Sequence, residues 1–168
     1  RWLSDEEFAA ALERIEAYAR TPRAREGTVD ALRLAVLLSL RAGEIVSLKA
    51  SSVSPCRRYL YLEDTKVGDR VVPIGGEAAK ILTRRKNRTS SPDCYLFPAA
   101  SKTGHATVSG VSHAFRRVVA VPLGIADVCL HSCRHSWASM AFRRGKRLEK
   151  VRRVLGHSTE HMTAKYSH

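Results

Sequence analysis

Two histidines, an arginine and a tyrosine near the C-terminus have types and spacing suited to phosphodiester cleavage. His131 and Arg134 are three residues apart, so on a helix an imidazole and a guanidinium converge on one phosphate. His157 follows in Leu155-Gly156-His157, and Tyr166 comes nine positions later in a short polar segment. Cleavage through a protein nucleophile needs an attacking oxygen, donors for the charge around phosphorus, and an acid for the departing sugar oxygen. These residues are candidates for the nucleophile and the donors.

The charge of the chain predicts a polyanionic partner. Lys and Arg number 29 against 16 Asp and Glu, which gives a formal net charge of +13. The planar donor fork of arginine matches phosphate better than the ammonium group of lysine, which favours nucleic acid over a membrane surface. Composition alone leaves one alternative open, a basic surface that serves only solubility.

The cysteines predict neither disulfides nor a metal site. Their spacing fits no disulfide framework and no apolar N-terminal run resembles a secretory signal, which indicates a reduced, cytoplasmic compartment. The four cysteines are Cys56, Cys94, Cys129 and Cys133. Cys129 and Cys133 alternate with His131 and His135, but residues two apart point to different faces of a helix, so we expect no metal and no cofactor. No apolar stretch approaches the ~20 residues that span a bilayer, so we expect no membrane partner.

The first part of the chain predicts two helices. With 168 residues, 44% of them hydrophobic, the chain is long enough for one sizeable core and short for two, so we expect one domain, residues 1–168. Ser4 and Glu7 have the spacing of a capping box, which begins a helix that runs to about Arg20. Thr28 is expected to cap a second helix that ends at Gly43, and its broad apolar surface predicts a central position.

The remainder predicts one small sheet among further helices. Residues 59–62 and 70–74 flank a polar turn and indicate a β-hairpin, with room for a third short strand. Helices are expected over 76–86, from Thr107 or Ser109 onward, and over 131–144, 147–155 and 160–166, and the Ser-rich stretch 84–93 reads as an exposed loop. No βαβ alternation is present, which argues against a doubly wound nucleotide-binding fold. The predicted class is α+β, mostly helical, with one small antiparallel sheet.

Four boxes together resemble the phage integrases and related tyrosine recombinases. His131-x-x-Arg134, then Leu155-Gly156-His157, then Tyr166 are similar to the C-terminal signature of that family. The segment 40–48 is similar to the first-arginine box, with Glu44 three residues after Arg41, and Thr65-Lys66 resembles the β-turn lysine segment. The boxes come in the family's order and span nearly the whole chain. The resemblance implies the fold of a tyrosine recombinase catalytic domain.

The resemblance also implies a role for each group. Tyr166 would be the nucleophile that forms a 3′-phosphotyrosyl link and frees a 5′-hydroxyl. Arg41 and Arg134 would hold the non-bridging oxygens, because guanidinium stays protonated and donates bidentately, and His157 would add a donor. Lys66 would be the acid for the 5′-oxygen.

His131 would assist proton removal from Tyr166, whose reference pKa of ~10 leaves it mostly neutral. Glu44 and His135 are expected to support these groups by packing or hydrogen bonding. Two dipeptides depart from the usual family pattern, Leu38-Ser39 in place of Thr-Gly and Ser132-Cys133 in place of Asp-Leu. Neither removes a catalytic group, but both leave open how Arg41 and His131 are oriented.

Further basic residues are candidates for contacts with DNA phosphates. Runs of one sign on separate elements are what a surface that follows a duplex backbone needs. The candidates are Arg84, Arg85, Lys86, Arg88, Arg116, Arg117, Arg143, Arg144, Arg152 and Arg153, with Lys146 and Arg147 in the same runs.

The resemblance implies double-stranded DNA as the partner, with four protomers on two duplexes for the full-length protein and a monomer for the isolated domain. We expect this chain to lack the family's N-terminal DNA-binding domain and to carry a short C-terminal tail. Two alternatives remain: type IB topoisomerase-like cleavage and rejoining, and a non-enzymatic basic domain that binds DNA or RNA.

Overall fold

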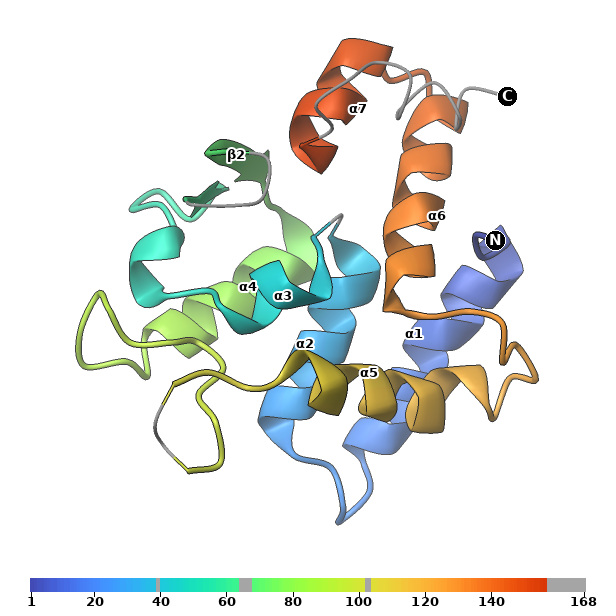
Figure 1. Cartoon of the computed structure of the whole chain (residues 1–168), viewed down its shortest axis with the longest axis horizontal. Coiled ribbons are helices and arrows are strands. Elements are labelled where there is room, and N and C mark those ends of the chain that lie inside the picture. The colour runs from blue at the N-terminus through green and yellow to red at the C-terminus, as the bar shows by residue number, and fades with distance from the viewer. Residues whose placement is uncertain (39, 64–67, 102–103, 157–168) are drawn as a thin grey trace.

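The computed structural model describes residues 1–38, 40–63, 68–101 and 104–156 (Figure 1). Its elements in chain order are α1 (Asp5–Ala19), α2 (Glu26–Leu37), α3 (Ala42–Val46), the 3-10 turn η1 (Ala50–Ser52), β1 (Tyr59–Leu62), β2 (Arg70–Pro73), α4 (Gly76–Lys86), α5 (Val108–Phe115), the π-helical turn η2 (Arg116–Ala120), α6 (Leu130–Arg143) and α7 (Leu148–Leu155). The predicted class, mostly helical with one small antiparallel sheet, is confirmed. Among the described residues, no helix has both the length and the apolar character needed to cross a membrane.

Helix α1 begins as its sequence predicts. The Ser4 hydroxyl accepts a hydrogen bond from the Glu7 N–H at 3.2 Å, and the Glu7 carboxylate accepts one from the Ser4 N–H at 2.9 Å. Both donors would otherwise lack a partner at the helix start. Ala11 and Ile15 on the buried face are closed off from solvent, and α1 packs against α2.

Helix α2 occupies the centre of the fold, in contact with α1, α3, α4, α5 and α6. Its predicted bounds were wrong at both ends. It begins at Glu26 after Arg25 rather than at Thr28, and it ends at Leu37 rather than Gly43. Leu38 is extended (φ −118°, ψ 152°), and a separate helix, α3, begins at Ala42. The break follows from Glu44, whose carboxylate accepts the Arg41 N–H at 2.7 Å and thereby caps a new helix.

The predicted hairpin is confirmed. Strands β1 and β2 are antiparallel, with Leu60 opposite Val72 and Leu62 opposite Arg70. Leu60, Leu62 and Val72 face the core, whereas Tyr61 faces solvent. Val53, which precedes the hairpin in the chain, makes an isolated antiparallel bridge to Leu60. The hairpin therefore presents one buried face to the rest of the protein.

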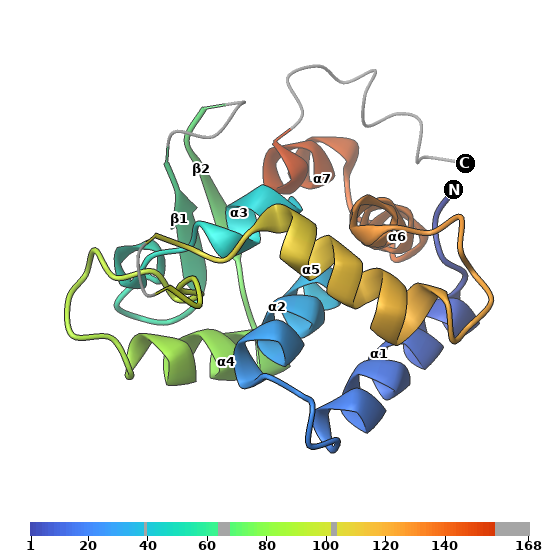
Figure 2. The same cartoon turned by 60° about the horizontal axis from the view of Figure 1, so that its bottom comes forward.

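Helix α7 packs between the hairpin and α6. Figure 2 shows α7 between the hairpin and α6, and α7 contacts both α6 and β2. Ala138 and Ala141 of α6 pack with Val151 and Leu155 of α7 in a small apolar cluster of their own. A groove of about 490 Å³ runs between β2, α6 and α7, and Trp137 of α6 lines it.

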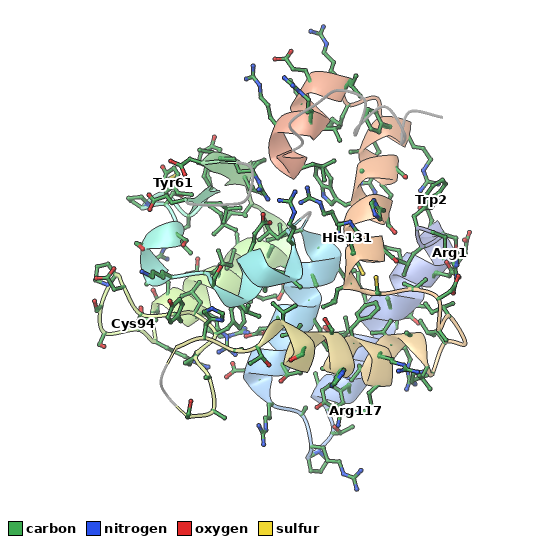
Figure 3. The ribbon with its side chains drawn as sticks, viewed as in Figure 1. Arg1, Trp2, Tyr61, Cys94, Arg117 and His131 are labelled. Atoms are coloured by element: carbon green, nitrogen blue, oxygen red, sulfur yellow. The ribbon has the colours of Figure 1, made fainter. Side chains whose placement is uncertain are left out.

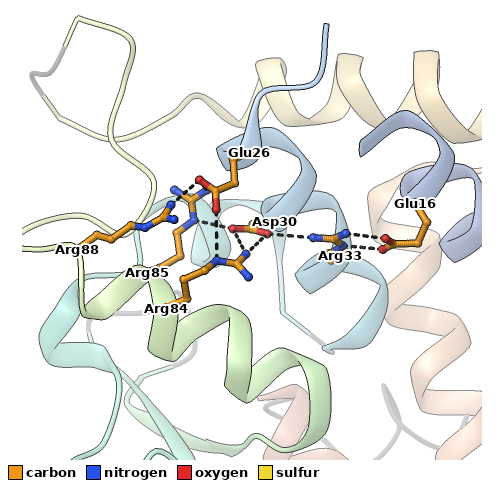
Figure 4. A network of polar contacts seen from close by, with 7 residues as sticks. All are labelled: Glu16, Glu26, Asp30, Arg33, Arg84, Arg85 and Arg88. Carbon is orange, nitrogen blue, oxygen red and sulfur yellow. Dashed lines mark hydrogen bonds and ion pairs between the residues drawn. The ribbon is translucent and has the colours of Figure 1, made fainter. Parts of the chain in front are cut away.

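Asp30 organises a buried ion-pair network that joins α2 to α4 (Figure 4). Its side chain is 0% exposed and accepts hydrogen bonds from Arg84 at 2.7 and 2.8 Å and from Arg85 at 2.8 Å. Arg33 pairs with Asp30 at 3.4 Å and also with Glu16 of α1 at 2.7 Å, so the network extends to α1. A buried carboxylate requires this compensation, because an unpaired charge in the interior is costly.

Candidate active site

Arg134 lies inside the protein and connects α6 to the end of α7. The residue is 2% exposed, and its guanidinium donates a hydrogen bond to the backbone carbonyl of Leu155. Leu155 is the last residue of α7 and the first of the Leu155-Gly156-His157 box. A charge-assisted hydrogen bond therefore joins two of the predicted boxes, which lie on different helices and 21 residues apart.

Gly156 ends α7 immediately before His157. Its backbone is left-handed (φ 64°, ψ 47°), and its N–H donates to the carbonyl of Arg152 at 2.8 Å. Residues with a side chain rarely adopt this conformation, which explains why the position before His157 is a glycine. His157, Tyr166 and Lys66 lie outside the described residues, and so does the helix predicted over 160–166.

Arg41 is held at the start of α3 by Glu44. The Arg41 guanidinium donates to one carboxylate oxygen of Glu44 at 2.9 Å, while the Arg41 backbone N–H donates to the other. Glu44 also accepts a hydrogen bond from Arg70 of β2 at 2.7 Å. Burial opposes ionisation of Glu44, but the hydrogen bonds from Arg70 and from the Arg41 backbone outweigh it and lower the pKa of the carboxyl. Glu44 is therefore a carboxylate that contacts both Arg41 and Arg70.

His131 sits at the start of α6 and is neutral near physiological pH. Figure 3 shows it on the side of α6 that faces α2 and α3. Packing of the ring against protein and the positive charges of Arg134 and Arg41 all lower the pKa of His131 below its usual 6.5. Because both arginines act on this imidazole, the three predicted residues share one electrostatic environment. A neutral imidazole beside two guanidinium groups can accept a proton while they bind an anion.

His135 packs edge-on against His131 one helical turn away. The ring centroids are 4.4 Å apart with an interplanar angle of 86°. Partial burial, followed by the charges of His131 and Arg134, lowers the pKa of His135 to about 4. The geometry fits a packing role for His135 that fixes the His131 ring.

The departure at Ser132-Cys133 does not disturb the start of α6. Ser132 accepts the Cys129 N–H at 3.2 Å and so caps the helix. The Cys133 thiol is buried, and burial raises its pKa to about 12. Within the described part of the chain, no three His, Cys, Asp or Glu side chains group as metal ligands would.

Sequence reasoning missed Arg70. It was treated only as a strand residue, yet its side chain is 7% exposed and contacts Glu44. Strand alternation contains the signal, because Arg70 shares a face with Val72, which is buried. A charged residue that must point inward at the end of a hairpin requires a partner of opposite charge.

The basic candidates for DNA contact fall into two groups. In the first group the basic side chains bind other parts of the protein. Arg84 and Arg85 bind Asp30, Arg88 pairs with Glu26, and Lys86 donates a hydrogen bond to the Val53 carbonyl at 2.6 Å. Arg84 to Lys86 also belong to the last turn of α4, so the loop predicted from residue 84 begins later.

In the second group the side chains lie on the surface. Arg116, Arg117 and Arg144 are exposed, and so are Arg143, which pairs with Asp5 at 2.6 Å, and Arg153, which pairs with Glu149 at 2.6 Å. Exposed pairs of this kind are weak and open readily. Arg152 is half-buried on α7.

Comparison with known proteins gives concordant matches. A sequence model described as the phage integrase family matches residues 1–168. The tyrosine recombinase XerD of Brucella suis biovar 1 (strain 1330) is 32% identical over 152 residues, 83% of this chain and 49% of that protein. The tyrosine recombinase XerC of Erythrobacter litoralis is 30% identical over 170 residues, 99% of this chain and 54% of that one. The chain thus spans about half the length of the curated relatives it matches.

Solved structures share the fold. The crystal structure of XerA recombinase superposes with a TM-score of 0.80 at 22% identity, over 100% of this chain and 59% of that one. The XerH site-specific recombinase, in a post-cleavage complex with a palindromic difH substrate, superposes with a TM-score of 0.81 at 18% identity. The match covers 99% of this chain and 49% of that one.

Proposed function

The chain belongs to the phage integrase family, and on this basis we propose that it is the DNA-cleaving catalytic domain of a site-specific recombinase. The observation that supports this most directly is the shared environment of Arg41, His131 and Arg134, with Arg134 bound to the carbonyl of Leu155. Two fixed cations and a neutral base suit one phosphodiester group.

Cleavage then proceeds by attack of a tyrosine on phosphorus. The phenol oxygen of Tyr166 forms a bond to phosphorus while its proton passes to neutral His131. The bond from phosphorus to the 5′-oxygen breaks, and Lys66 donates a proton to that oxygen. Arg41, Arg134 and His157 bind the non-bridging oxygens, whose charge grows in the transition state. Attack of another 5′-hydroxyl on the 3′-phosphotyrosyl link reverses these steps and joins a new strand.

Double-stranded DNA is the partner in this proposal, supported by the net charge of +13 and by the DNA complex of XerH. We assign phosphate contacts to the exposed arginines Arg116, Arg117, Arg143, Arg144 and Arg153 and to Arg152, and not to those that bind Asp30 or Glu26. Assembly of four protomers on two duplexes and a cytoplasmic location belong to the same proposal.

The test is covalent trapping on DNA. The probe is a pool of nicked duplexes, randomised around the nick, in which the short strand with the freed 5′-hydroxyl diffuses away after cleavage. We expect a denaturant-resistant adduct whose peptide maps to Tyr166. Tyr166→Phe should bind DNA as well as the parent but form no adduct, while Tyr59→Phe, at an exposed strand tyrosine, should react normally. An adduct on any other residue, or one that persists in Tyr166→Phe, would contradict the proposal.

A further inference from the structure

Arg70 is a buried cation whose side chain has a single partner among the described residues. It is the first residue of β2, and its side chain is 7% exposed. The guanidinium donates through Nη2 to Glu44 at 2.7 Å. Its Nε and Nη1 atoms are buried and have no hydrogen-bond partner among the described residues. Within the described part of the chain, nothing compensates these two donors for the hydration that they lose.

This arrangement is not explained by stability. Burial of a guanidinium with unsatisfied donors costs free energy, and a buried ion pair often contributes less than apolar residues of the same volume. By contrast, the geometry is well defined, because Glu44 is 9% exposed and shares its two oxygens between Arg70 and Arg41. The contact between Arg70 and Glu44 therefore fixes the position of the Glu44 carboxylate more than it stabilises the fold.

Arg70 also changes the charge beside the site. Arg41 and Glu44 by themselves form a neutral pair, which would weaken the attraction of Arg41 for a phosphate. With Arg70 the cluster carries one net positive charge, since a single carboxylate serves two guanidinium groups. Without Arg70, the carboxylate would be free to bind Arg41 more fully and to draw it away from an anion.

From this geometry we propose that Arg70 is a positioning residue for strand cleavage, which holds the Glu44 carboxylate and through it the guanidinium of Arg41; this rests on the proposed function. The same contact docks β2 onto α3. Lys66, the proposed acid, precedes Arg70 by four residues in the sequence that joins β1 to β2. The Arg70–Glu44 ion pair therefore links the hairpin that contains Lys66 to Arg41, the proposed phosphate ligand.

The first experiment is a double-mutant cycle in the cleavage step. Arg70→Gln, Glu44→Gln and the double variant are compared in single-turnover cleavage of a nicked duplex, with DNA affinity measured separately. We expect Arg70→Gln to slow cleavage by ~10- to 100-fold, the usual effect of a lost orienting contact, with little change in Kd. The double variant should be no slower than the slower single variant, because Arg70 acts through Glu44. Arg70→Lys should recover part of the rate.

Arg33→Gln is the matched control. Arg33 is also a largely buried arginine paired with a carboxylate, Glu16, but it lies between α1 and α2. Its substitution should lower the melting temperature and leave the cleavage rate of the folded protein unchanged. Equal cleavage by Arg70→Gln and the parent, or fully additive losses in the cycle, would overturn the inference.

The second experiment does not depend on activity. The side-chain ¹⁵Nε signal of Arg41, assigned through its loss in Arg41→Lys, reports the hydrogen bonding of that guanidinium. It should shift in Arg70→Gln and stay in place in Arg33→Gln. A parent chain that forms no adduct would refute the proposed function alone, whereas an unmoved Arg41 signal in Arg70→Gln would refute the positioning role.

Discussion

The guanidinium of Arg134 donates a hydrogen bond to the backbone carbonyl of Leu155. This contact makes the end of α7 a partner of a buried cation on α6, so Arg134 has a structural neighbour in addition to its proposed anion. Helices normally leave their last carbonyls without partners inside the helix, and this one is satisfied by a side chain from another helix. Substitution of Arg134 should therefore affect both catalysis and the placement of α7.

Arg134→Lys is expected to cleave DNA ~10²- to 10³-fold more slowly than the parent. Lysine keeps the charge but loses the donor fork, so it cannot bind the Leu155 carbonyl and a phosphate oxygen together. Single-turnover cleavage measures the effect. Arg33→Lys, at an arginine of α2 that pairs with Glu16 of α1, serves as the control and should cleave at nearly the parental rate. Parental cleavage by Arg134→Lys would rule out the bidentate role.

Gly156→Ala should lower the free energy of unfolding by ~1–2 kcal/mol, because its left-handed backbone disfavours a side chain. It should also slow cleavage, because the strain falls directly before His157. Gly124→Ala provides a comparison, since Gly124 is also left-handed (φ 68°) and has open space around it. Gly124→Ala should lose similar stability in chemical denaturation but retain the cleavage rate. Equal rates for the two variants would show that Gly156 only ends a helix.

Stability should fall as the pH drops from about 6.5 toward 4. The pKa of His135 is lowered to about 4 in the folded protein against 6.5 in the unfolded chain, and that of His131 is lowered as well. In this window the unfolded chain binds more protons than the folded one, so the free energy of unfolding rises with pH. His135→Gln should flatten this dependence in denaturation curves recorded across the window. An unchanged slope in that variant would exclude His135 as a source.

Salt dependence should separate the two groups of arginines. DNA affinity is expected to fall with salt at a log–log slope of ~0.9 per phosphate neutralised. Arg116→Gln, at an exposed position, should reduce the slope by about one such unit. Arg85→Gln should leave the slope unchanged but lower the free energy of unfolding by ~1–3 kcal/mol, because Arg85 binds buried Asp30. A reduced slope for Arg85→Gln would assign it to DNA after all.

Lys66 can be tested through the leaving group. A 5′-bridging thiolate departs without protonation, whereas an alkoxide does not. Lys66→Ala should thus be badly impaired on a normal duplex and largely rescued on a 5′-thio-bridged one, while Arg134→Ala remains impaired on both. Equal defects of Lys66→Ala on the two substrates would indicate that Lys66 holds DNA rather than delivering a proton.

Local signals predicted local structure well. The Ser4 and Glu7 spacing defined the start of α1, Thr107 caps α5 by accepting the Gly110 N–H at 3.1 Å, and strand alternation identified the hairpin. The break between α2 and α3 was missed because the apolar run around Leu38 suits either a long helix or a buried extended segment. The glutamate that decides between them had been assigned only to support Arg41.

Contacts between distant segments were beyond sequence reasoning. The four predicted boxes were recognised in the sequence because their order and spacing are distinctive. The binding of Arg84 and Arg85 to Asp30, more than fifty residues earlier, could not be predicted. A basic run next to a loop has the same sequence whether its side chains face solvent or a buried carboxylate. For Arg70, strand alternation indicates that the side chain points inward, but it does not identify the partner Glu44, which lies on another element.

The groove between β2, α6 and α7 gives the protein an intrinsic optical reporter. The chain has two tryptophans, of which Trp2 is 48% exposed and Trp137 lines the groove beside Val71 and Pro73 of the hairpin. Replacing Trp2 by phenylalanine leaves Trp137 as the single tryptophan, in the groove between the hairpin and helices α6 and α7. Its emission wavelength responds to the polarity around the indole, so steady-state and stopped-flow fluorescence can follow the separation of these two parts without any attached label.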